Sequence, residues 1–471
     1  MAIQFYNSLS HRVEELAPIK PGKIGMYTCG PTVYNFAHIG NFRCYAFEDI
    51  LKRTLMASGL KVRHVMNLTD VDDKTIRGSQ AEKLPLQTFT RKYKDAFFSD
   101  IKTLRMVPAD VYPAATETIP EMIQLIQTLF DKGIAYQAED KSVYFSIEKW
   151  PQYGQLVKID RDSMRVGVRI KMDEYAKDAM ADFALWKAWD EADGDVWWDS
   201  PWGKGRPGWH IECSAMSSKY LGKTFDLHCG GIDNMFPHHE DEIAQSEAAN
   251  GCKFVNLWMH CAHLMVEGQK MSKSLGNFYT LKDILEKGYT GREIRYVLIG
   301  TYYRQSLNFS FQALDEARGN LQRIDAFTTR LADVAKNGAA GEVTAEQQEA
   351  FAKAQDAFLA ALQNDLNVSA GLAALFDFIR DCNRALDANA FSAEAAKAAQ
   401  AVLAKMDEVL AVIEPDAAEL VIPAEIQALA DERQAARAAK DWAKADAMRK
   451  ALDDAGWVVK DTPKGPQLLK K

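Results

Sequence analysis

Short apolar runs alternate with longer amphipathic segments over the first hundred residues of the chain. Residues 24–27 and 62–68 have the length and apolar content of strands, whereas residues 42–58 and 86–104 repeat apolar side chains at the spacing of a helix. Strands that alternate with helices predict a parallel α/β sheet, and ligands of such sheets bind at the carboxyl ends of the strands.

The alternation stops over residues 113–200. A helix is expected at 117–132, followed by a hairpin with arms at 134–137 and 143–147. The strand pattern returns later in the chain, at 225–227 and 257–261. We therefore interpret 113–200 as an insertion between two halves of a nucleotide-binding fold.

Beyond residue 310 the chain is rich in alanine and almost entirely helical. Residues 351–364 and 370–386 carry apolar side chains at intervals of three and four, which predicts a packed helical bundle. One more helix is expected at 424–455, before a short β-like tail at 457–469. The predicted domains are a Rossmann-like catalytic domain at 1–310 with a connecting region at 254–310, a helical bundle at 311–414, and a small mixed α/β C-terminal domain at 423–471.

The composition is typical of a globular protein with several domains. The chain has 471 residues, of which 47% are hydrophobic and 26% are charged, enough for a large buried core. No apolar run reaches the length of a membrane span and the first ten residues lack the pattern of a signal peptide, so we expect a cytoplasmic protein without a membrane partner. Seven cysteines without paired spacings favour metal binding or burial over disulfides.

The charge is unevenly distributed along the chain. The net charge of −8 argues against a protein that binds nucleic acid over its whole surface. Residues 431–471 nevertheless contain ten Lys/Arg and seven Asp/Glu. Polyanion binding is therefore expected to be local, and the C-terminal segment is one candidate place.

Two short strings give the first chemical signal. The first is His38-Ile39-Gly40-Asn41. It follows a predicted strand and opens a predicted helix, so backbone N–H groups and the positive end of the helix dipole face the ligand side of the sheet, which favours phosphate. The second is Lys270-Met271-Ser272-Lys273-Ser274. It places two lysines on a loop bounded by glycines, which can close over a triphosphate.

In this order, the two strings resemble the signatures of class I aminoacyl-tRNA synthetases. The resemblance implies ATP as a substrate with Mg²⁺, and donors and cations that stabilise phosphate charge as an amino acid is activated. The residues expected in catalysis are His38, Gly40, Asn41, Lys270 and Lys273. The nucleotide site is expected to include also Asp233, Met271, Ser272 and Ser274. The family string usually ends in a second histidine, and Asn41 can replace its hydrogen bond but not its charge.

Four dispersed residues form a candidate zinc set. They are Cys29, Cys213, His238 and Glu242. The last two are four apart where a helix is expected to begin after proline, so both side chains lie on one face. His239 and Glu240 are equally available by composition, but the residue four after His239 is isoleucine, which makes His238 with Glu242 the better pair. Buried free cysteines and ordinary helix capping would explain the same residues without a metal.

Longer strings make the resemblance more specific, because over essentially its whole length the chain is similar to the cysteinyl-tRNA synthetase family. The matching strings are MYTCGPTVY (26–34), TDVDDK (69–74), RPGWHIECSAM (206–216), MFPHHE (235–240), KMSKSLGN (270–277) and KDW (440–442). The resemblance implies one zinc ion per chain on the candidate zinc set. It also implies a cysteine pocket formed by Gly30, Thr69, Trp209, His228, Asp233 and His260. Cys229 stands where the family commonly has glycine, and an extra thiol there could crowd the pocket or compete for the metal.

A zinc ion would solve a problem of selectivity. Cysteine and serine differ by one atom, and a plain cavity separates such near-isosteres by only roughly 100-fold. Zinc is thiophilic and deprotonates a coordinated thiol, whereas a serine hydroxyl ionises far less readily. We therefore expect the metal to select the substrate, and we expect no editing domain.

The helix expected at 424–455 carries a stripe of basic residues at intervals of four, three and four. They are Arg433, Arg437, Lys440 and Lys444. Basic residues bind nucleic-acid backbones, and the nearby Trp442 and Trp457 could stack on unpaired bases. A solvated helix face and core tryptophans would give the same pattern. The family resemblance, in which the C-terminal domain reads the anticodon, favours contacts to tRNA.

The leading hypothesis is an enzyme that forms cysteinyl-AMP and transfers cysteine to the terminal adenosine of tRNA(Cys). One alternative is a ligase that passes cysteinyl-AMP to an amino sugar, which would lack a full C-terminal RNA-binding region. Another is a non-catalytic module that binds zinc and tRNA, which would not need the lysine string. A different class I synthetase, such as one for methionine, should not present the two cysteines with histidine and glutamate. A monomer is expected from the resemblance alone.

Overall fold

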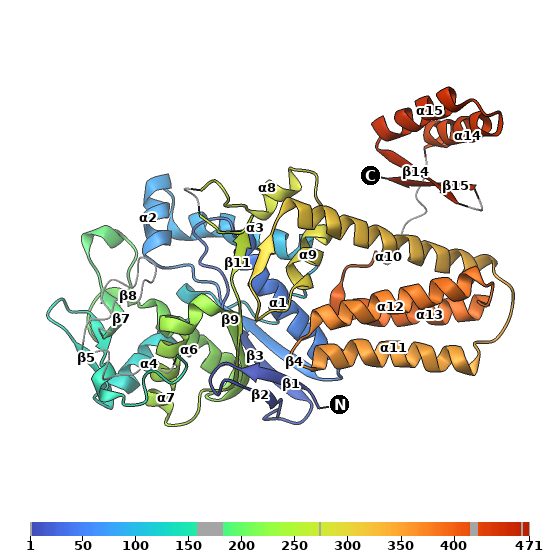
Figure 1. The fold of residues 1–471 in the computed structure, drawn as a ribbon. Helices are drawn as coiled ribbons and strands as arrows, with labels where there is room; N and C mark the ends of the chain where they lie inside the picture. Colours follow the sequence, from blue (N-terminus) through green and yellow to red (C-terminus); the bar gives the residue numbers. More distant parts are fainter. Residues whose placement is uncertain (1, 158–181, 273–274, 415–422, 463–464, 471) are drawn as a thin grey trace. The chain divides into compact units, whose positions relative to one another are not determined.

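The chain divides into two units, Met1–Ile413 and Glu414–Lys471. The structure is a computed structural model (Figure 1), and it describes residues 2–157, 182–272, 275–414, 423–462 and 465–470. None of the helices in this described part is long and apolar enough to cross a membrane.

A parallel sheet of four strands lies at the centre of the first unit. In spatial order its strands are β10 (Val255–Cys261), β9 (Phe225–Gly231), β3 (Lys23–Thr28) and β4 (Lys61–Met66). The two strands of the first half of the fold lie on one side and those of the second half on the other. Ligands of such sheets bind where the strand order reverses, which here is the border between β3 and β9. The predicted parallel α/β sheet is confirmed.

Helices on both sides of this sheet supply its core. α1 (Ile39–Ala57) follows β3 and buries Phe42, Ala46 and Ile50 completely or almost completely. The other helices and strands of the catalytic fold are α2 (Asp73–Glu82), α3 (Leu86–Thr103), α6 (Trp209–Leu221), α7 (Glu240–Asn250), α8 (Leu281–Leu285), α9 (Gly291–Gly300), the hairpin β1 (Gln4–Asn7) and β2 (Arg12–Glu15), and a small sheet of β12 (Gln269–Lys270), β11 (Leu264–Val266) and β13 (Leu307–Phe309).

The predicted insertion forms an antiparallel sheet of its own. Its strands are β5 (Ala135–Gln137), β6 (Val143–Phe145), β7 (Phe183–Ala188) and β8 (Gly205–Pro207), preceded by α4 (Ile119–Asp131). Short 3₁₀ turns lie at Ala115–Glu117, Ile147–Lys149 and Glu191–Asp193. The expected hairpin is confirmed by β5 and β6. The sheet continues past residue 200, because β8 pairs with β7 and leads directly into α6.

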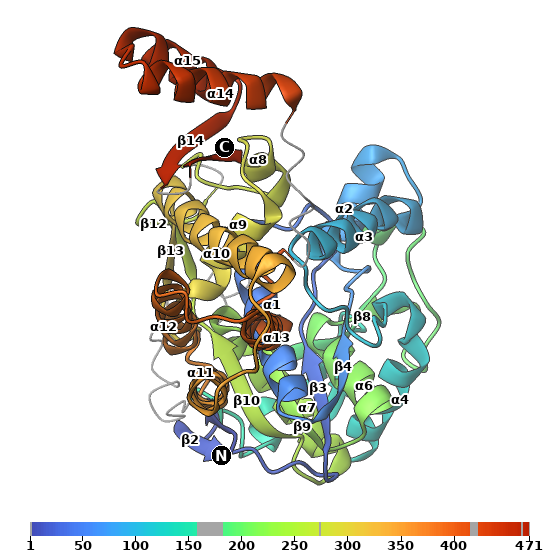
Figure 2. The ribbon, with the colours of Figure 1, turned by 90° about the vertical axis from the view of Figure 1, so that its right-hand side faces the viewer.

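Four helices after β13 form the predicted bundle. They are α10 (Phe311–Asn337), α11 (Ala345–Gln363), α12 (Val368–Asp387) and α13 (Ala393–Leu410). Their buried faces and the buried face of α1 belong to one continuous apolar cluster. Figure 2 shows α1 beside α13 and α11, and residues of these helices are in contact. The bundle therefore packs directly on the helix that follows the first string.

The second unit is a helical hairpin followed by a β-hairpin. Its elements are α14 (Ala424–Ala438), α15 (Trp442–Asp454), β14 (Trp457–Thr462) and β15 (Gly465–Lys470). The prediction of one helix over 424–455 was wrong. The chain turns at Lys440, whose φ is +59°, and the Asp441 side chain then caps a new helix by accepting from the Lys444 backbone N–H.

Candidate active site and metal centre

The candidate zinc set lies at the carboxyl edge of the central sheet. Cys29 directly follows β3, Cys213 lies on α6, and Glu242 lies on the first turn of α7. His238 belongs to a short turn, Met235–His239, that precedes α7. One ligand atom of each residue lies within 4.8 Å of those of the other three. Three segments far apart in sequence thus bring the four predicted residues together.

A second set of four overlaps the first. Cys29 and Glu242 also lie within 4.8 Å of ligand atoms from His228 and His239. The His239 Nε2 atom is 3.2 Å from the Cys29 Sγ atom. His239 was set aside in the sequence because the residue four further on is isoleucine, although Glu242 stands three residues after it. That criterion compares residues on one helix and cannot detect a partner supplied by the neighbouring strand.

The chemistry of the donors fits a divalent cation. Cys213, His238 and Glu242 are at most 2% exposed, and Cys29 is half-buried. Burial raises the pKa of Glu242 well above its usual value and lowers the pKa of His238. The pKa of Cys29 is raised, first by its hydrogen bond with the Cys213 thiol and second by burial. The ion-pair partners of Glu242 among the described residues are histidines, not lysine or arginine. Two thiolates, an imidazole and a carboxylate match the ligands that zinc prefers, and an ion would compensate their buried charge.

Further histidines hold the donor side chains in place. The His228 Nε2 atom lies 2.9 Å from Glu242 Oε2, and the His210 Nδ1 atom lies 2.8 Å from His238 Nδ1. On the other side, His239 Nδ1 contacts His260 Nε2 at 2.8 Å. Burial lowers the pKa of His210, His228 and His260 to about 3, so these rings are neutral near pH 7. Hydrogen bonds of this kind orient metal-binding side chains and set their tautomers.

The residues expected to form the cysteine pocket surround this cluster. Trp209, 37% exposed, stacks on His238 with ring centroids 4.2 Å apart. Thr69 Oγ1 donates to Glu212 Oε2 at 2.6 Å, and Glu212 is the residue before Cys213. Gly30 N donates to Asn67 Oδ1 at 2.9 Å. Glu212 and Asn67, which sequence reasoning missed, thus fix two of the expected contact residues.

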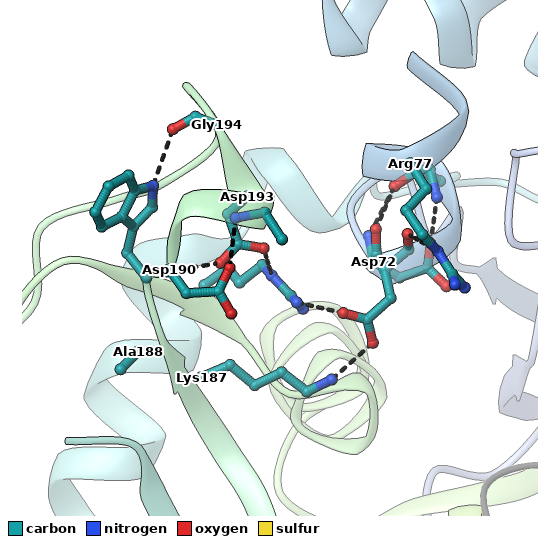
Figure 3. A network of polar contacts seen from close by, with 12 residues as sticks. Asp72, Arg77, Lys187, Ala188, Asp190, Asp193 and Gly194 are labelled. Atoms are coloured by element: carbon teal, nitrogen blue, oxygen red, sulfur yellow. Dashed lines mark hydrogen bonds and ion pairs between the residues drawn. The ribbon is translucent and has the colours of Figure 1, made fainter. Parts of the chain in front are cut away.

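An ion-pair network links α2 to the strands of the insertion (Figure 3). Asp73, on α2, accepts from Lys187 Nζ at 2.8 Å and also from Arg206. Arg206 Nε donates in addition to Asp193 Oδ1 at 2.8 Å. α2 follows the segment that carries Thr69, and Arg206 stands three residues before Trp209. The network therefore holds the Thr69 segment against the strands of the insertion that lead to Trp209.

The first string opens α1, as predicted, and also caps it. His38 is the N-cap residue, and its Nδ1 atom accepts from the Asn41 backbone N–H at 3.2 Å. In return the His38 backbone N–H donates to Asn41 Oδ1 at 3.1 Å. Because Nδ1 is an acceptor, the proton of the neutral ring lies on Nε2. A Cβ atom at Gly40 would lie 3.0 Å from the His38 ring, so glycine keeps this turn open.

The second string lies beside the first. A Cβ atom at Gly40 would come 3.2 Å from Met271 Cε, and Ile39 N donates to Tyr279 O at 2.9 Å. Lys270 ends β12, and Ser272 N donates to Asn277 Oδ1 at 2.8 Å. The two strings are therefore neighbours in space, as the nucleotide-site prediction requires. Lys273 and Ser274 lie outside the described residues.

Cys229 and Asp233 complete the expected site residues. Cys229 is fully buried on β9 and belongs to the apolar cluster on the α1 side of the sheet. Neighbouring residues of a strand point to opposite faces, so its thiol lies on the face opposite to His228. Among the described residues it belongs to neither metal set. Asp233 follows β9 in a short 3₁₀ turn, Ile232–Asn234, at the same edge as the metal cluster.

The basic stripe of the C-terminal unit is not continuous. Arg433 is buried at 6% exposure on α14, whereas Lys440 in the turn and Lys444 on α15 are exposed. The four residues lie on two helices and a turn, because the expected helix is broken at Lys440. Trp457 is a core residue, while Trp442 is 60% exposed.

Sequence models of three families match the chain. A model described as the class I (C) tRNA synthetase catalytic domain matches residues 15–319, a DALR domain matches 357–414, and a cysteinyl-tRNA ligase anticodon-binding domain matches 421–467. A cysteine–tRNA ligase of Protochlamydia amoebophila is 48% identical over 472 residues, covering 100% of this chain and 98% of that protein. One from Chlamydia pneumoniae is also 48% identical, over 468 residues, 99% of this chain and 98% of the relative.

Solved structures share the fold. Methionyl-tRNA synthetase of Mycobacterium tuberculosis, in complex with methionyl-adenylate, superposes with a TM-score of 0.60 at 16% identity, over 83% of this chain and 90% of that one. A ternary LeuRS–tRNA complex of Agrobacterium radiobacter gives a TM-score of 0.61 at 12% identity, over 84% and 85% of the two chains. At these identities the likeness concerns the fold alone.

Proposed function

The chain belongs to the cysteinyl-tRNA synthetase family of class I aminoacyl-tRNA synthetases, and from this premise we propose how its residues carry out the reaction. As a cysteine–tRNA ligase, it uses cysteine, ATP and tRNA.

We assign one Zn²⁺ per chain to Cys29, Cys213, His238 and Glu242. When bound, the ion would supply a thiophilic Lewis acid that favours a substrate thiolate over the hydroxyl of serine. The set with two thiols is preferred over the set with His228 and His239, because soft thiolate ligands select zinc. His228 then serves to orient Glu242, as their 2.9 Å contact supports.

The cysteine pocket is assigned to the residues around this set. Trp209 is exposed enough to cover a bound amino acid, and its stacking on His238 ties its orientation to a metal ligand. Thr69, fixed by Glu212, and the backbone at Gly30 are assigned to the polar groups of the substrate. His260 supports the pocket through His239.

Activation is assigned to the two strings. The cysteine carboxylate attacks the α-phosphorus of ATP, and pyrophosphate leaves; a Mg²⁺ ion accompanying the nucleotide would offset the phosphate charge. His38 donates from Nε2 to phosphate oxygen, since its Nδ1 atom is engaged with Asn41. The Asn41 amide oxygen is likewise engaged, which leaves its NH₂ group as a neutral donor. Lys270 and Lys273 would neutralise the departing pyrophosphate, with Asp233, Met271, Ser272 and Ser274 completing the site.

The C-terminal unit is assigned to tRNA. Lys440 and Lys444 are exposed and Arg437 is half-buried, so these three can reach phosphates. Trp442 offers a ring for stacking on an unpaired base. Arg433 is kept as a supporting residue because of its burial. A cytoplasmic monomer remains a prediction.

The amino-sugar ligase and the non-catalytic module have less support. The match to an anticodon-binding domain at 421–467 is not expected for the former. The proximity of Met271 to Gly40 keeps the nucleotide strings together, which a module without catalysis does not need. We therefore retain the cysteine–tRNA ligase with a zinc-dependent choice of substrate.

The observation that carries this proposal is the approach of the four ligand atoms to within 4.8 Å of one another at the carboxyl edge of the sheet. The test is ATP–pyrophosphate exchange with each of the twenty amino acids, before and after treatment with a chelator. We expect exchange with cysteine alone, its loss on chelation and its return with Zn²⁺. Chelated enzyme that still prefers cysteine over serine by the same factor would contradict the assignment.

A further inference from the structure

The chain leaves the first unit through a segment of fixed conformation, residues 408–413, which we call the exit segment. α13 ends at Leu410, and Ala411 follows with a φ of +52°. The Asp407 carboxylate then accepts from the backbone N–H groups of Val412 and Ile413, at 2.7 and 2.8 Å. The turn is therefore closed by a side chain of α13 itself.

Guanidinium groups hold the carbonyl groups of this segment. Arg53 Nη1 donates to Glu408 O at 2.8 Å, and Arg295 Nε donates to Leu410 O at 2.7 Å. The remaining contacts are made by Arg292 to Val412 O, and by Arg105 to Ile413 O at 3.2 Å. We call Arg53, Arg105, Arg292 and Arg295 the exit clamp. None of them lies on a bundle helix, since they come from α1, from the residues after α3 and from α9.

Acidic residues keep the clamp in place. Asp49 Oδ2 accepts from Arg53 Nε at 2.9 Å and from Arg295 Nη2 at 2.6 Å, and Arg295 is fully buried. Asp325 holds Arg292 through two bonds, at 2.8 and 2.6 Å. Such paired bonds orient a guanidinium group strongly. Closing a helix end requires only the turn and water, so this arrangement does more than cap α13.

The clamp is connected to the nucleotide site through α1. This helix begins at the His38 cap and carries Asp49 and Arg53, so a single rigid element reaches from the first string to the exit segment. At 1.5 Å per residue, His38 and Asp49 are separated by roughly 16 Å along the axis. Figure 2 shows α1, α9 and α13 gathered at one place, and α1 contacts both of the others.

The exit segment is also the point at which the chain leaves the first unit for the second. The second unit begins at Glu414 and contains the match to the anticodon-binding domain. When two binding modules are linked, the attachment point of the linker sets the effective concentration of one relative to the other. An attachment point with a fixed conformation therefore favours binding of the anticodon and of the 3′ end of one tRNA at the same time. A flexible exit segment would lower this effective concentration and leave each of the two binding sites intact.

We propose that the exit clamp is a positioning device for tRNA, so that cognate tRNA capture depends on it whereas cysteine activation does not. The inference rests on the proposed function only in assuming that both units bind the same tRNA. Arg292 and Arg105 are the residues to test, because both donate to carbonyl groups of the exit segment and neither is assigned to the nucleotide or cysteine site.

The experiment compares Arg292→Ala and Arg105→Ala with Arg330→Ala. Arg330 lies on α10 and pairs with Asp387 at 2.6 Å and Asn383 at 3.0 Å, both on α12, so its removal perturbs the bundle and spares the exit segment. We expect each clamp variant to raise the KM for tRNA about tenfold, with cysteine-dependent pyrophosphate exchange and kcat nearly unchanged. Arg330→Ala should leave both reactions as they are. Arg292→Lys should restore the KM for tRNA only in part, because one ammonium group cannot bridge Asp325 and Val412 O as the planar guanidinium group does.

Equal losses in exchange and in tRNA charging would overturn the proposal, and so would unchanged KM values for tRNA in both clamp variants. Thermal melting identifies a variant that does not fold. If Arg292→Ala does not fold, Arg105→Ala, which leaves the Arg292–Asp325 pair in place, provides the test. A wild-type protein without cysteine-dependent exchange would refute the proposed function instead. In that case tRNA binding measured on filters still tests the clamp, with an expected weakening in the clamp variants and none in Arg330→Ala.

Discussion

The candidate metal cluster and the C-terminal unit arrange their polar side chains in opposite ways. The cluster is a set of buried polar side chains from distant segments, each held by another member of the set. The C-terminal unit has a small apolar core around Leu452 and Trp457, whereas Lys440 and Lys444 are exposed. Selecting one sulfur atom requires donors that are desolvated and fixed, whereas holding a polyanion requires exposed positive charge.

This difference predicts how each region responds to substitution. Members of a buried network share partners, so the loss of one disturbs the others and the effects are not additive. Exposed cations act mainly through charge, and their effects should add and weaken with salt. Substitutions in the two regions can therefore be distinguished by size, additivity and salt dependence.

The largest effect is expected for Cys213→Ser. Serine keeps nearly the same shape but removes a thiolate ligand, so zinc affinity should fall steeply, and pyrophosphate exchange should drop by at least about 100-fold. Cys382→Ser is the matched control, because Cys382 is equally buried but lies on α12 in the bundle. Zinc content by mass spectrometry, measured together with exchange, checks the prediction. A zinc-replete Cys213→Ser enzyme would show that this thiol is not a ligand.

Histidine substitutions separate the two overlapping sets. We expect His238→Ala to lose the metal, and His239→Ala to retain it with affinity weakened about 10- to 100-fold, because His239 supports Cys29 and His260 without being a ligand. Competition with a chromogenic chelator measures both affinities. The reverse order would favour the set formed by Cys29, His228, His239 and Glu242.

The sequence supports the cluster better than the C-terminal unit, for a physical reason. Cys29, Cys213, His238 and Glu242 were identified by residue type, by the spacing on one helix and by resemblance, and the fold brings them together. His239 was set aside and Glu212 and Asn67 were missed, because their roles depend on contacts between strands and helices that no local spacing encodes. The alternation of strands and helices, in contrast, follows from local periodicity and was predicted correctly.

At residues 424–455, in contrast, the local pattern led to a wrong prediction. Alanine, lysine, arginine and other strong helix formers occupy most positions from 424 to 455, so propensity predicts one helix. The structure turns at Lys440 because Asp441 caps α15 and the two helices then bury Ala430 and Leu452 in one core. The signal was present as an aspartate before a new helical segment, but a charged surface residue and a cap look the same without the tertiary contacts.

Arg433 and the two lysines test this corrected picture. Arg433→Ala should destabilise the C-terminal unit, since the side chain is buried, and should lower its resistance to proteolysis. The double substitution of Lys440 and Lys444 by alanine should leave stability intact and weaken tRNA binding about tenfold, with the slope of affinity against salt reduced by about two. Cysteine-dependent exchange should not change in either variant. An unaltered salt slope in the double variant would exclude these lysines as phosphate contacts.

The smallest effect is expected for a half-buried carboxyl that belongs to neither metal set. Asp100, half-buried on α3, has its pKa raised to about 6 by burial alone. Because this value lies above that of the unfolded chain, about 3.9, the protonated carboxyl stabilises the fold fully below pH 4, and this contribution is lost as the pH rises through 6. Asp100→Asn removes the charge, so it should be more stable than wild type by about 1 kcal/mol at pH 8, after allowance for partial exposure. The difference should shrink toward pH 4.5. Urea unfolding at these pH values measures it, and a variant that is less stable at pH 8 would show that Asp100 has a favourable partner, as the metal-binding carboxylate Glu242 is proposed to have.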